Sequence, residues 1–170
     1  TYLSIYKGKT VSATGHTGVK GSWLCLVFKI LGAKVYGYSL KPEKTYSNFY
    51  LNKLDKSMKN SYADIRNYDK LKRYVSTVKP DIVFHLAAQA LVKDSYIDPL
   101  KTFSTNIMGT ANILNIIKNQ KSIKAIVCIT SDKCYENKEW IYGYRENDQL
   151  GGIDPYSASK ASAEIIFSSF

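Results

Sequence analysis

The sequence predicts an α/β fold in which a parallel, doubly wound sheet carries helices on both faces. Short apolar runs of strand length alternate with longer segments of helical periodicity along the whole chain. This alternation is the pattern of successive βαβ units, which place parallel strands in one sheet with helices packed against it. A glycine-rich turn between the first strand and the first helix is a second indication. With 170 residues, 45% of them hydrophobic, the chain has the size and composition of one globular domain.

Five strands and four helices follow from this pattern. Strands are expected over residues 10–13, 34–38, 59–63, 82–86 and 125–130. Helices are expected over residues 19–31, 68–78 and 100–118, and from residue 156 to the end of the chain. Gly32 and Pro80 stand just beyond two of these helices, where glycine and proline commonly end a helix. Because the chain stops in or just after the last helix, we expect residues 1–170 to be the N-terminal part of a larger protein.

The formal net charge of +10 admits nucleic acid or phosphorylated small molecules as partners. The lysines are scattered, however, and the densest run, residues 70–73, falls on an amphipathic helical segment with apolar Tyr74 and Val78. Such a run is typical of a solvated helix face. We therefore expect a phosphorylated small molecule and no nucleic acid.

Cysteine usage and the first residues indicate a cytoplasmic protein. Cys25, Cys128 and Cys134 are odd in number and lack CxxC spacing, so neither a disulfide framework nor a zinc site is suggested. The first residues carry no signal-peptide pattern, and no uncharged apolar run is long enough to span a bilayer. We expect no membrane partner and no metal, since His16 and His85 have no partners at metal-ligand spacing.

The glycine-rich turn predicts a dinucleotide site of the Rossmann type. Gly15, Gly18 and Gly21 follow a strand and open a helix, the context that gives such a pattern its meaning. A backbone without Cβ atoms turns tightly and approaches a pyrophosphate, whose charge is held by free amides and the positive end of the helix dipole. His16, as a loop donor, and Thr17 are expected to bind with the glycines. The spacing is GxxGxxG rather than GxGxxG, which points to the short-chain dehydrogenases.

The end of the second strand leaves the choice between NAD and NADP open. An acid about 20 residues beyond the turn commonly binds the adenosine ribose of NAD, but this position reads Ser39-Leu40-Lys41. We expect Ser39 at the ribose. Lys41 and Lys44 either face a 2′-phosphate or are solvated loop lysines.

Two further positions are candidates for the cofactor site. Just past the third strand, Asp64 and Ile65 are expected at the adenine, with a plain turn as the alternative for Asp64. In the long helix after the fourth strand, Asn106 either holds that helix open for a water or backbone bond or is simply exposed.

Ser131, Tyr156 and Lys160 form the predicted catalytic group. Ser131 is expected to end a buried strand, and the carboxyl ends of parallel strands line the ligand crevice of such a sheet. Positions i and i+4 share one face of a helix, so the Lys160 ammonium can lie near the Tyr156 phenol and favour its ionised form. Tyr68 and Lys72 have the same spacing but no serine-bearing strand end before them, and we assign them to a surface helix. The group predicts hydride transfer from a carbohydrate-like alcohol to a nicotinamide.

Asp132 and Lys133, directly after Ser131, extend the prediction. Oxidation alone needs only the serine, tyrosine and lysine, whereas an adjacent acid and base allow loss of water from the oxidised sugar. A surface turn, where Asp-Lys is common, is the alternative.

Several motifs together closely resemble the CDP-glucose 4,6-dehydratases, which are extended short-chain dehydrogenases of the NAD-dependent epimerase/dehydratase family. The resemblance runs from about residue 5 to residue 170. Its motifs are residues 14–24 (TGHTGVKGSWL), 84–89 (FHLAAQ), 105–110 (TNIMGT), 130–135 (TSDKCY) and 144–147 (YREN).

The resemblance implies a fold, a cofactor and a reaction. It implies a Rossmann domain that binds NAD, here with Leu86, Ala87 and Ala88 among the contacts, and a C-terminal sugar-nucleotide domain beyond this chain. The implied reaction converts CDP-glucose to CDP-4-keto-6-deoxyglucose in deoxysugar biosynthesis for lipopolysaccharide O-antigen, by a lyase expected to be a homo-oligomer when full length.

The resemblance also implies roles for individual residues. Tyr156 would take the proton of the glucose 4-hydroxyl, Lys160 would bind the nicotinamide ribose, and Ser131 would hold the oxygen. Asp132 would protonate the hydroxyl that leaves C6, while the lysine at position 133, a glutamate in relatives that act on dTDP-glucose, leaves the identity of the C5 base open. A sugar-nucleotide epimerase or reductase, or a noncatalytic nucleotide-binding module, remain the alternatives.

Overall fold

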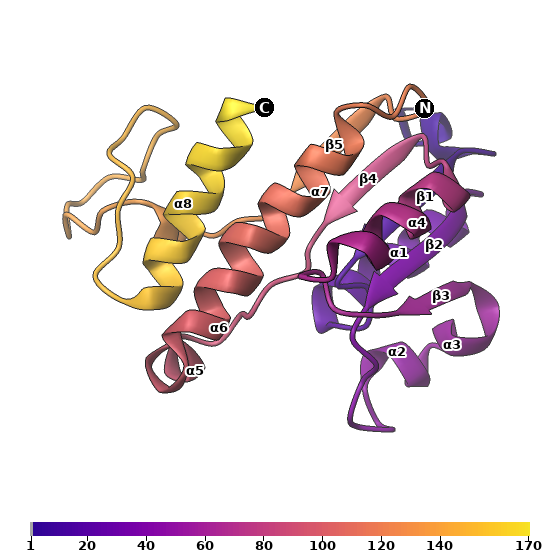
Figure 1. Cartoon of the computed structure of the whole chain (residues 1–170), viewed down its shortest axis with the longest axis horizontal. Helices are drawn as coiled ribbons and strands as arrows, with labels where there is room; N and C mark the ends of the chain where they lie inside the picture. The colour runs from indigo at the N-terminus through magenta and orange to yellow at the C-terminus, as the bar shows by residue number, and fades with distance from the viewer. Residues whose placement is uncertain (1) are drawn as a thin grey trace.

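The computed structural model describes residues 2–170 and contains the predicted parallel sheet with helices on both faces (Figure 1). Within these residues, five strands lie in the order β3-β2-β1-β4-β5, and each neighbouring pair is parallel. The winding direction reverses between β1 and β4, the point at which such sheets bind ligands. The strands are β1 (Thr10–Thr14), β2 (Lys34–Ser39), β3 (Lys59–Tyr62), β4 (Ile82–His85) and β5 (Ala125–Cys128).

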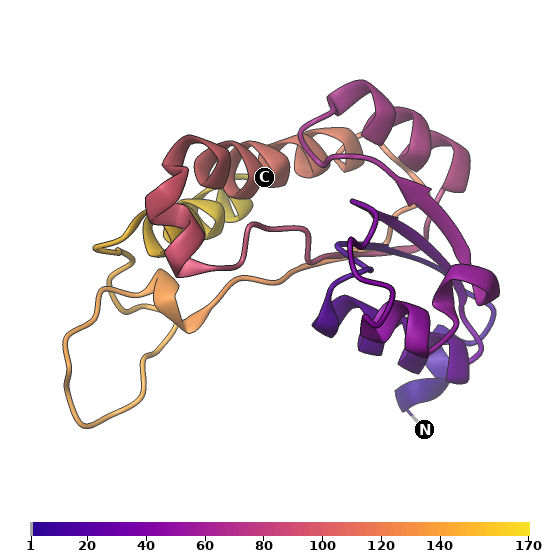
Figure 2. The same ribbon diagram turned by 90° about the horizontal axis from the view of Figure 1, so that it is seen from below.

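Helices on the two faces of the sheet enclose separate apolar cores (Figure 2). One face is covered by α1 (Val19–Ile30) and the short helices α2 (Asn48–Leu51) and α3 (Leu54–Ser57). The other is covered by α4 (Tyr68–Val78) and α7 (Gly109–Ile117). Burial on both faces suits the apolar run of β4, whereas β1 buries the polar residues Ser12 and Thr14 as well.

The predicted helices are confirmed, with one refinement. The helix expected over residues 100–118 consists of α6 (Pro99–Phe103), a π-helical segment (Ser104–Met108) and α7. It lies beside α8 (Pro155–Ser169), the helix of Tyr156 and Lys160 (Figure 1). The structure adds one- to two-turn helices that are too short to show a period in the sequence: α2, α3, α5 (Val92–Ile97) and the 3₁₀ segments Tyr2–Tyr6 and Asp132–Cys134. No helix within residues 2–170 is long and apolar enough to cross a membrane.

Strand β5 is not the buried strand that the sequence predicts. It ends at Cys128, and it forms an edge of the sheet with alternately exposed residues, such as Val127 at 40% exposure. Only β4 pairs with it in the described part of the chain, so one of its edges has no neighbouring strand to cover it. Ser131 therefore lies in an extended segment beyond the sheet rather than at the end of a strand.

His85 is a satisfied core histidine, as predicted. Its Nδ1 lies 2.7 Å from Thr14 Oγ1 and its Nε2 lies 3.2 Å from Thr110 Oγ1. Because the Thr110 hydroxyl donates to the Asn106 carbonyl (2.6 Å), the Thr110 oxygen must accept from Nε2–H, and Nδ1 must accept from Thr14. Burial, reinforced by nearby Lys160, lowers the pKa of His85 to about 3.

His16 is buried beneath the glycine turn and is not the loop donor that the sequence predicts. Its ring packs against Phe49 (5.4 Å between centroids), and neither ring nitrogen has a hydrogen-bond partner among the described residues. Burial lowers the pKa of His16 to about 4. The nearby Asn60 side chain and Tyr38 backbone oppose this shift, but neither forms a hydrogen bond with the ring.

We predict that acidification destabilises the protein through these two histidines. Each folded pKa lies below the unfolded value of about 6.5, so the unfolded state binds more protons below that pH and stability falls as the pH drops. Between pH 7.5 and pH 5 the free energy of unfolding should fall by about 2 kcal/mol for each histidine. Urea unfolding across this range should show the loss, and His85→Gln should make it smaller. A flat profile in both proteins contradicts the prediction.

We also predict that Gly37→Ala destabilises the fold. A Cβ at Gly37, in β2, would lie 2.3 Å from Cδ2 of His16, which is fully buried. The overpacking should cost about 1–3 kcal/mol of unfolding free energy, measured by chemical denaturation. Gly143→Ala is the matched control: nothing lies within 4 Å of its Cβ position, and stability should change by less than about 0.5 kcal/mol. Equal stabilities of the two variants contradict the close approach.

Candidate functional site

A cavity of about 630 Å3 lies at the carboxyl ends of β1, β2, β3 and β4, where it also borders α8. The end of each of these strands contributes residues to its wall, as expected at the reversal point of the sheet. Many of the residues predicted to bind a cofactor line it: Gly15, Thr17, Gly18, Gly21, Ser39, Asp64, Ile65, Leu86, Ala87, Ala88, Tyr156 and Lys160. The sequence prediction and the cavity thus converge on one place in the fold.

The glycine turn has the geometry that a phosphate group requires. Gly15 has φ +72°, and a Cβ there would lie 2.7 Å from the Ala87 nitrogen; at Gly21 it would lie 2.3 Å from the Gly15 carbonyl oxygen. Gly15 and Gly21 are therefore required by packing within the chain. At Gly18 a Cβ would meet only the Gly15 oxygen, at 3.4 Å, and Gly18 is the N-cap of α1, with no side chain capping the helix. The uncapped amides and helix dipole suit a pyrophosphate.

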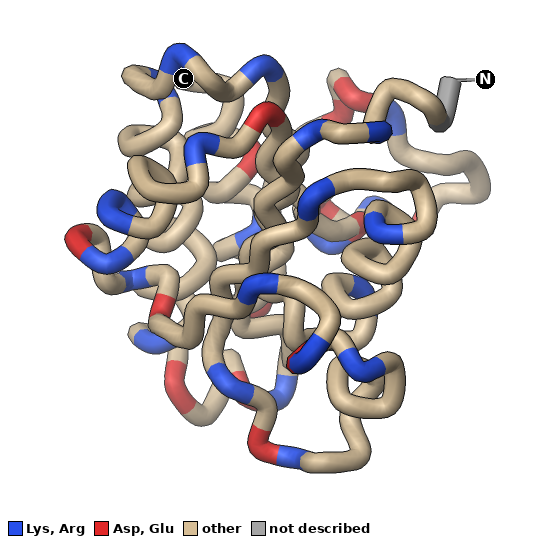
Figure 3. Tube along the Cα trace, turned by 90° about the vertical axis from the view of Figure 1, so that its right-hand side faces the viewer, with Lys and Arg blue, Asp and Glu red and all other residues tan. Residues whose placement is uncertain are grey.

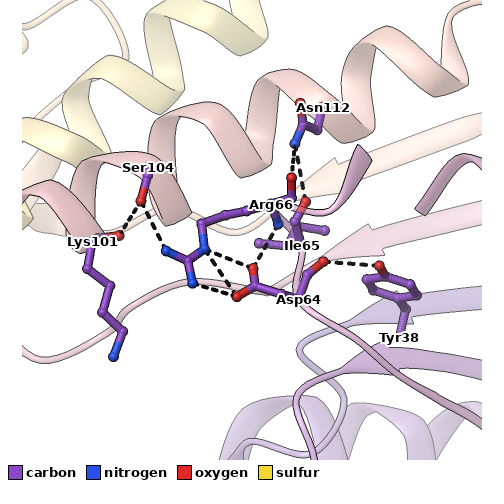
Figure 4. A network of polar contacts seen from close by, with 7 residues as sticks. All are labelled: Tyr38, Asp64, Ile65, Arg66, Lys101, Ser104 and Asn112. Atoms are coloured by element: carbon purple, nitrogen blue, oxygen red, sulfur yellow. Dashed lines mark hydrogen bonds and ion pairs between the residues drawn. The ribbon is translucent and has the colours of Figure 1, made fainter. Parts of the chain in front are cut away.

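Asp64 is held by an arginine that the sequence analysis did not single out (Figure 4). Arg66 donates from Nε to both carboxylate oxygens (3.0 and 3.1 Å), from Nη2 to Oδ2 (2.7 Å), and from its backbone amide to Oδ1 (2.8 Å). These bonds lower the pKa of Asp64, the side-chain bond from Arg66 being the largest cause. Asp64 is therefore an ionised acceptor at the edge of the cavity, which suits an amino group such as that of adenine.

Neighbouring elements fix the backbone of this segment. The Tyr38 hydroxyl donates to the Asp64 carbonyl (3.0 Å), and Asn112 of α7 donates to the carbonyls of Ile65 and Arg66 (3.3 and 3.4 Å) (Figure 4). Arg66 also reaches Ser104 of the π-helical segment (3.4 Å). The Asp-x-Arg spacing after a predicted strand was the signal in the sequence that could have identified Arg66.

Tyr156 and Lys160 lie in the first turns of α8, where Asp154 caps the helix by accepting from the Ser157 amide (2.9 Å). Both side chains are nearly buried, at 8% and 7% exposure, and both line the cavity. The Lys160 ammonium donates to the Ile129 carbonyl, just beyond β5, at 3.2 Å. Burial lowers the pKa of Lys160. An ammonium and a phenol therefore share one wall of the cavity.

Ser131, Asp132 and Lys133 lie next to the cavity but do not line it. Ser131 begins the 3₁₀ segment that packs against α8, and its hydroxyl donates to Asp132 Oδ1 (3.0 Å). The Asp132 side chain is 81% exposed and pairs loosely with Lys133 (3.4 Å). The Ser131 hydrogen bond, more than the Lys133 charge, lowers the pKa of Asp132.

The preceding residue, Thr130, does line the cavity, and sequence reasoning did not select it. Its hydroxyl donates to Glu164 of α8, which joins the segment before Ser131 to the helix of Tyr156. A threonine beyond a strand and a helical glutamate 34 residues later leave no pattern in the sequence that would pair them.

Asn106 is buried, at 2% exposure, and bridges two parts of the site without lining the cavity. Its Oδ1 accepts from the Gln89 amide (2.8 Å), while its Nδ2 donates to the Gln89 carbonyl (3.0 Å) and to Ser159 of α8 (2.8 Å). The prediction that it forms a backbone bond at an opening of the helix agrees with its place in the π-helical segment. The exposed alternative is wrong. Direct contact of Asn106 with a cofactor stays a prediction.

The charged side chains do not gather into one basic surface. Lysines and arginines are dispersed over the fold and interspersed with acids (Figure 3). Lys41 and Lys44, the candidates for a 2′-phosphate, do not line the cavity, and Lys44 lies over the ring of Tyr46 (5.6 Å to the centroid). The three cysteines are free, and Cys25 and Cys134 are buried.

Comparisons with solved structures bear out the fold. The epimerase Mth375 from Methanothermobacter thermautotrophicus superposes with a TM-score of 0.83 at 24% identity, over 99% of this chain and 49% of that chain. The UDP-glucose 4-epimerase of Thermus thermophilus, solved as a complex with NAD, gives a TM-score of 0.79 at 25% identity, over 94% of this chain and 50% of that chain.

The sequence comparisons are more specific. The CDP-glucose 4,6-dehydratase of Salmonella typhimurium is 50% identical over 167 residues, which cover 98% of this chain and 46% of the relative. The chain thus spans about half the length of this relative. The family model described as GDP-mannose 4,6 dehydratase matches residues 13–170. The chain belongs to the GDP-mannose 4,6-dehydratase family.

Proposed function

We propose that the protein containing this chain is a sugar-nucleotide 4,6-dehydratase, a lyase that acts on CDP-glucose with NAD as its bound cofactor. The observation that carries the proposal is the single cavity shared by the glycine turn and the Tyr156–Lys160 pair. The 50% identity to the Salmonella CDP-glucose 4,6-dehydratase supports the reaction and the sugar nucleotide. We place the protein in the cytoplasm, as a homo-oligomer.

The residues fit a nicotinamide dinucleotide along the length of the cavity. The uncapped start of α1 suits the pyrophosphate, Asp64 and Ile65 suit the adenine, and Lys160 suits the nicotinamide ribose. NAD bound there would accept the hydride from C4 of the sugar and later return it to C6.

Tyr156 takes the first proton. Its phenol, beside the Lys160 ammonium, would remove the proton of the glucose 4-hydroxyl while Ser131 hydrogen-bonds the same oxygen. The Ile129 carbonyl accepts from the Lys160 ammonium and holds it on the cavity wall that Tyr156 also lines. The products of this step are a 4-keto sugar and a protonated tyrosine.

The segment after Ser131 serves the elimination. A 4-keto group acidifies the proton at C5, so a base can remove it, and Asp132 would give a proton to the hydroxyl that leaves C6 as water. Lys133 lies beside Asp132 on this segment, with its ammonium 3.4 Å from Oδ2. When hydride returns to C6, C5 takes up a proton, and the 4-keto group remains in the product, CDP-4-keto-6-deoxyglucose.

Two variants of the full-length protein separate oxidation from elimination. Asp132→Asn should still reduce bound NAD when CDP-glucose is added, seen as nicotinamide absorbance, but should form the 4-keto-6-deoxy product about 10²- to 10⁴-fold more slowly. Tyr156→Phe, the control, should lose both steps. Equal loss of both steps in Asp132→Asn would contradict the role of Asp132. A wild-type protein that binds NAD and CDP-glucose without forming product would favour a noncatalytic module, and a product that keeps its 6-hydroxyl would favour an epimerase.

A further inference from the structure

The end of β2 contains a hydrogen-bond relay whose direction is fixed by its last member. Thr17 of the glycine turn lies with its Oγ1 2.8 Å from Ser39 Oγ and 3.0 Å from the carbonyl oxygen of Leu40. All three residues line the cavity. The relay therefore forms part of the wall against which the adenosine ribose would lie.

Each hydroxyl of the relay has one proton, and the geometry assigns both. The Leu40 carbonyl can only accept, so the Thr17 proton is used in that bond. The contact between Thr17 and Ser39 must then use the Ser39 proton. Both bonds form together in this direction only. Ser39 Oγ has no remaining proton to donate, and it presents lone pairs to the cavity.

Lone pairs at this position distinguish the two nicotinamide dinucleotides. The 2′-hydroxyl of NAD can donate to Ser39 Oγ, as it donates to the acid that usually stands at this place. The 2′-phosphate of NADP has acceptor oxygens and negative charge, so it needs donors or cations.

The cations that line the cavity come from elements other than β2. Lys41 and Lys44 do not line the cavity, and Arg66, which does, is paired with Asp64 just beyond β3. Lys20 and Lys101 also line it, but they belong to α1 and α6 and not to the end of β2, where Ser39 lies. The hydroxyls of β2 at the cavity are those of Tyr38 and Ser39, and the protons of both are already used, by the Asp64 carbonyl and by Thr17.

We propose that the Thr17–Ser39 relay makes this chain select NAD over NADP in place of the missing ribose-binding acid. The inference rests on the proposed function to the extent that a nicotinamide dinucleotide occupies the cavity. Thr17 acts as a positioning residue, because it fixes the direction of the Ser39 hydroxyl, and Ser39 is the residue that contacts the ribose.

Binding measurements on the full-length protein, stripped of nucleotide, test the proposal without any sugar nucleotide. Calorimetric titration with NAD+ and with NADP+ gives the ratio of their dissociation constants. Wild type should bind NAD+ at least about tenfold more tightly. Thr17→Val keeps the shape of the side chain but frees the Ser39 proton, which can then donate to a 2′-phosphate. The selectivity should fall about three- to tenfold, because one hydrogen bond contributes a free energy of this size to binding. Thr17→Ser retains the hydroxyl, and its selectivity should equal that of wild type.

Ser39→Ala completes the set. It should weaken NAD+ binding about three- to tenfold while leaving NADP+ binding unchanged or tighter. A wild-type preference for NADP+, or the same selectivity in Thr17→Val as in Thr17→Ser, would overturn the relay. Failure of wild type to bind either nucleotide would overturn the proposed function as well. A confirmed relay in a protein that does not dehydrate CDP-glucose would overturn the proposed reaction alone.

Discussion

The backbone of Gly15 approaches the backbone of Leu86 and Ala87 so closely that no side chain fits between them, and the shape of the cavity depends on this approach. A Cβ at Gly15 would lie within 2.9 Å of three of their backbone atoms. The contact joins the ends of β1 and β4, the two strands between which the sheet changes its direction of winding. The glycine turn and the residues after β4 are therefore positioned by backbone contact, which is more rigid than contact through side chains.

A chain of hydrogen bonds continues from this contact to α8. Thr14 Oγ1 accepts from the Ala87 amide (3.2 Å) and is bonded to His85 (2.7 Å), which is bonded in turn to Thr110 (3.2 Å). Thr110 donates to the Asn106 carbonyl (2.6 Å), and the Asn106 side chain donates to Ser159 (2.8 Å).

The last link reaches Tyr156, the tyrosine proposed to be catalytic. Ser159 donates to the carbonyl of Tyr156 (2.6 Å). Buried polar groups linked in this way carry a high penalty if one of them is left unpaired, so the links restrain one another. The neutral state of His85 is part of this arrangement, because a second ring proton, on Nδ1, would point at Thr14 Oγ1 and force the Thr14 hydroxyl to turn its own proton away. The position of Tyr156 relative to the glycine turn is thus set through the interior of the fold.

The sequence predicted the features that depend on local pattern and missed those that depend on pairing across the chain. The strands, the main helices and the glycine turn follow from periodicity and from glycine spacing, which are local. The burial of His16 depends on the absence of a side chain at Gly37, on another strand, and no local pattern contains that information. Thr130 and Glu164 meet only because α8 packs beside the segment after β5.

The exposure of Asp132 places a condition on the proposed elimination. A carboxylate that is 81% exposed and hydrogen-bonded by Ser131 has a lowered pKa, and it is a poor proton donor in that state. In the proposed reaction the Ser131 hydroxyl must donate its single proton to a hydrogen bond with the sugar oxygen. Its present hydrogen bond to Asp132 Oδ1 is then lost. Loss of this bond and burial under the sugar both raise the pKa of the carboxyl. The substrate itself would convert Asp132 into an acid, so that proton donation to the leaving hydroxyl follows correct binding at C4 and does not precede it.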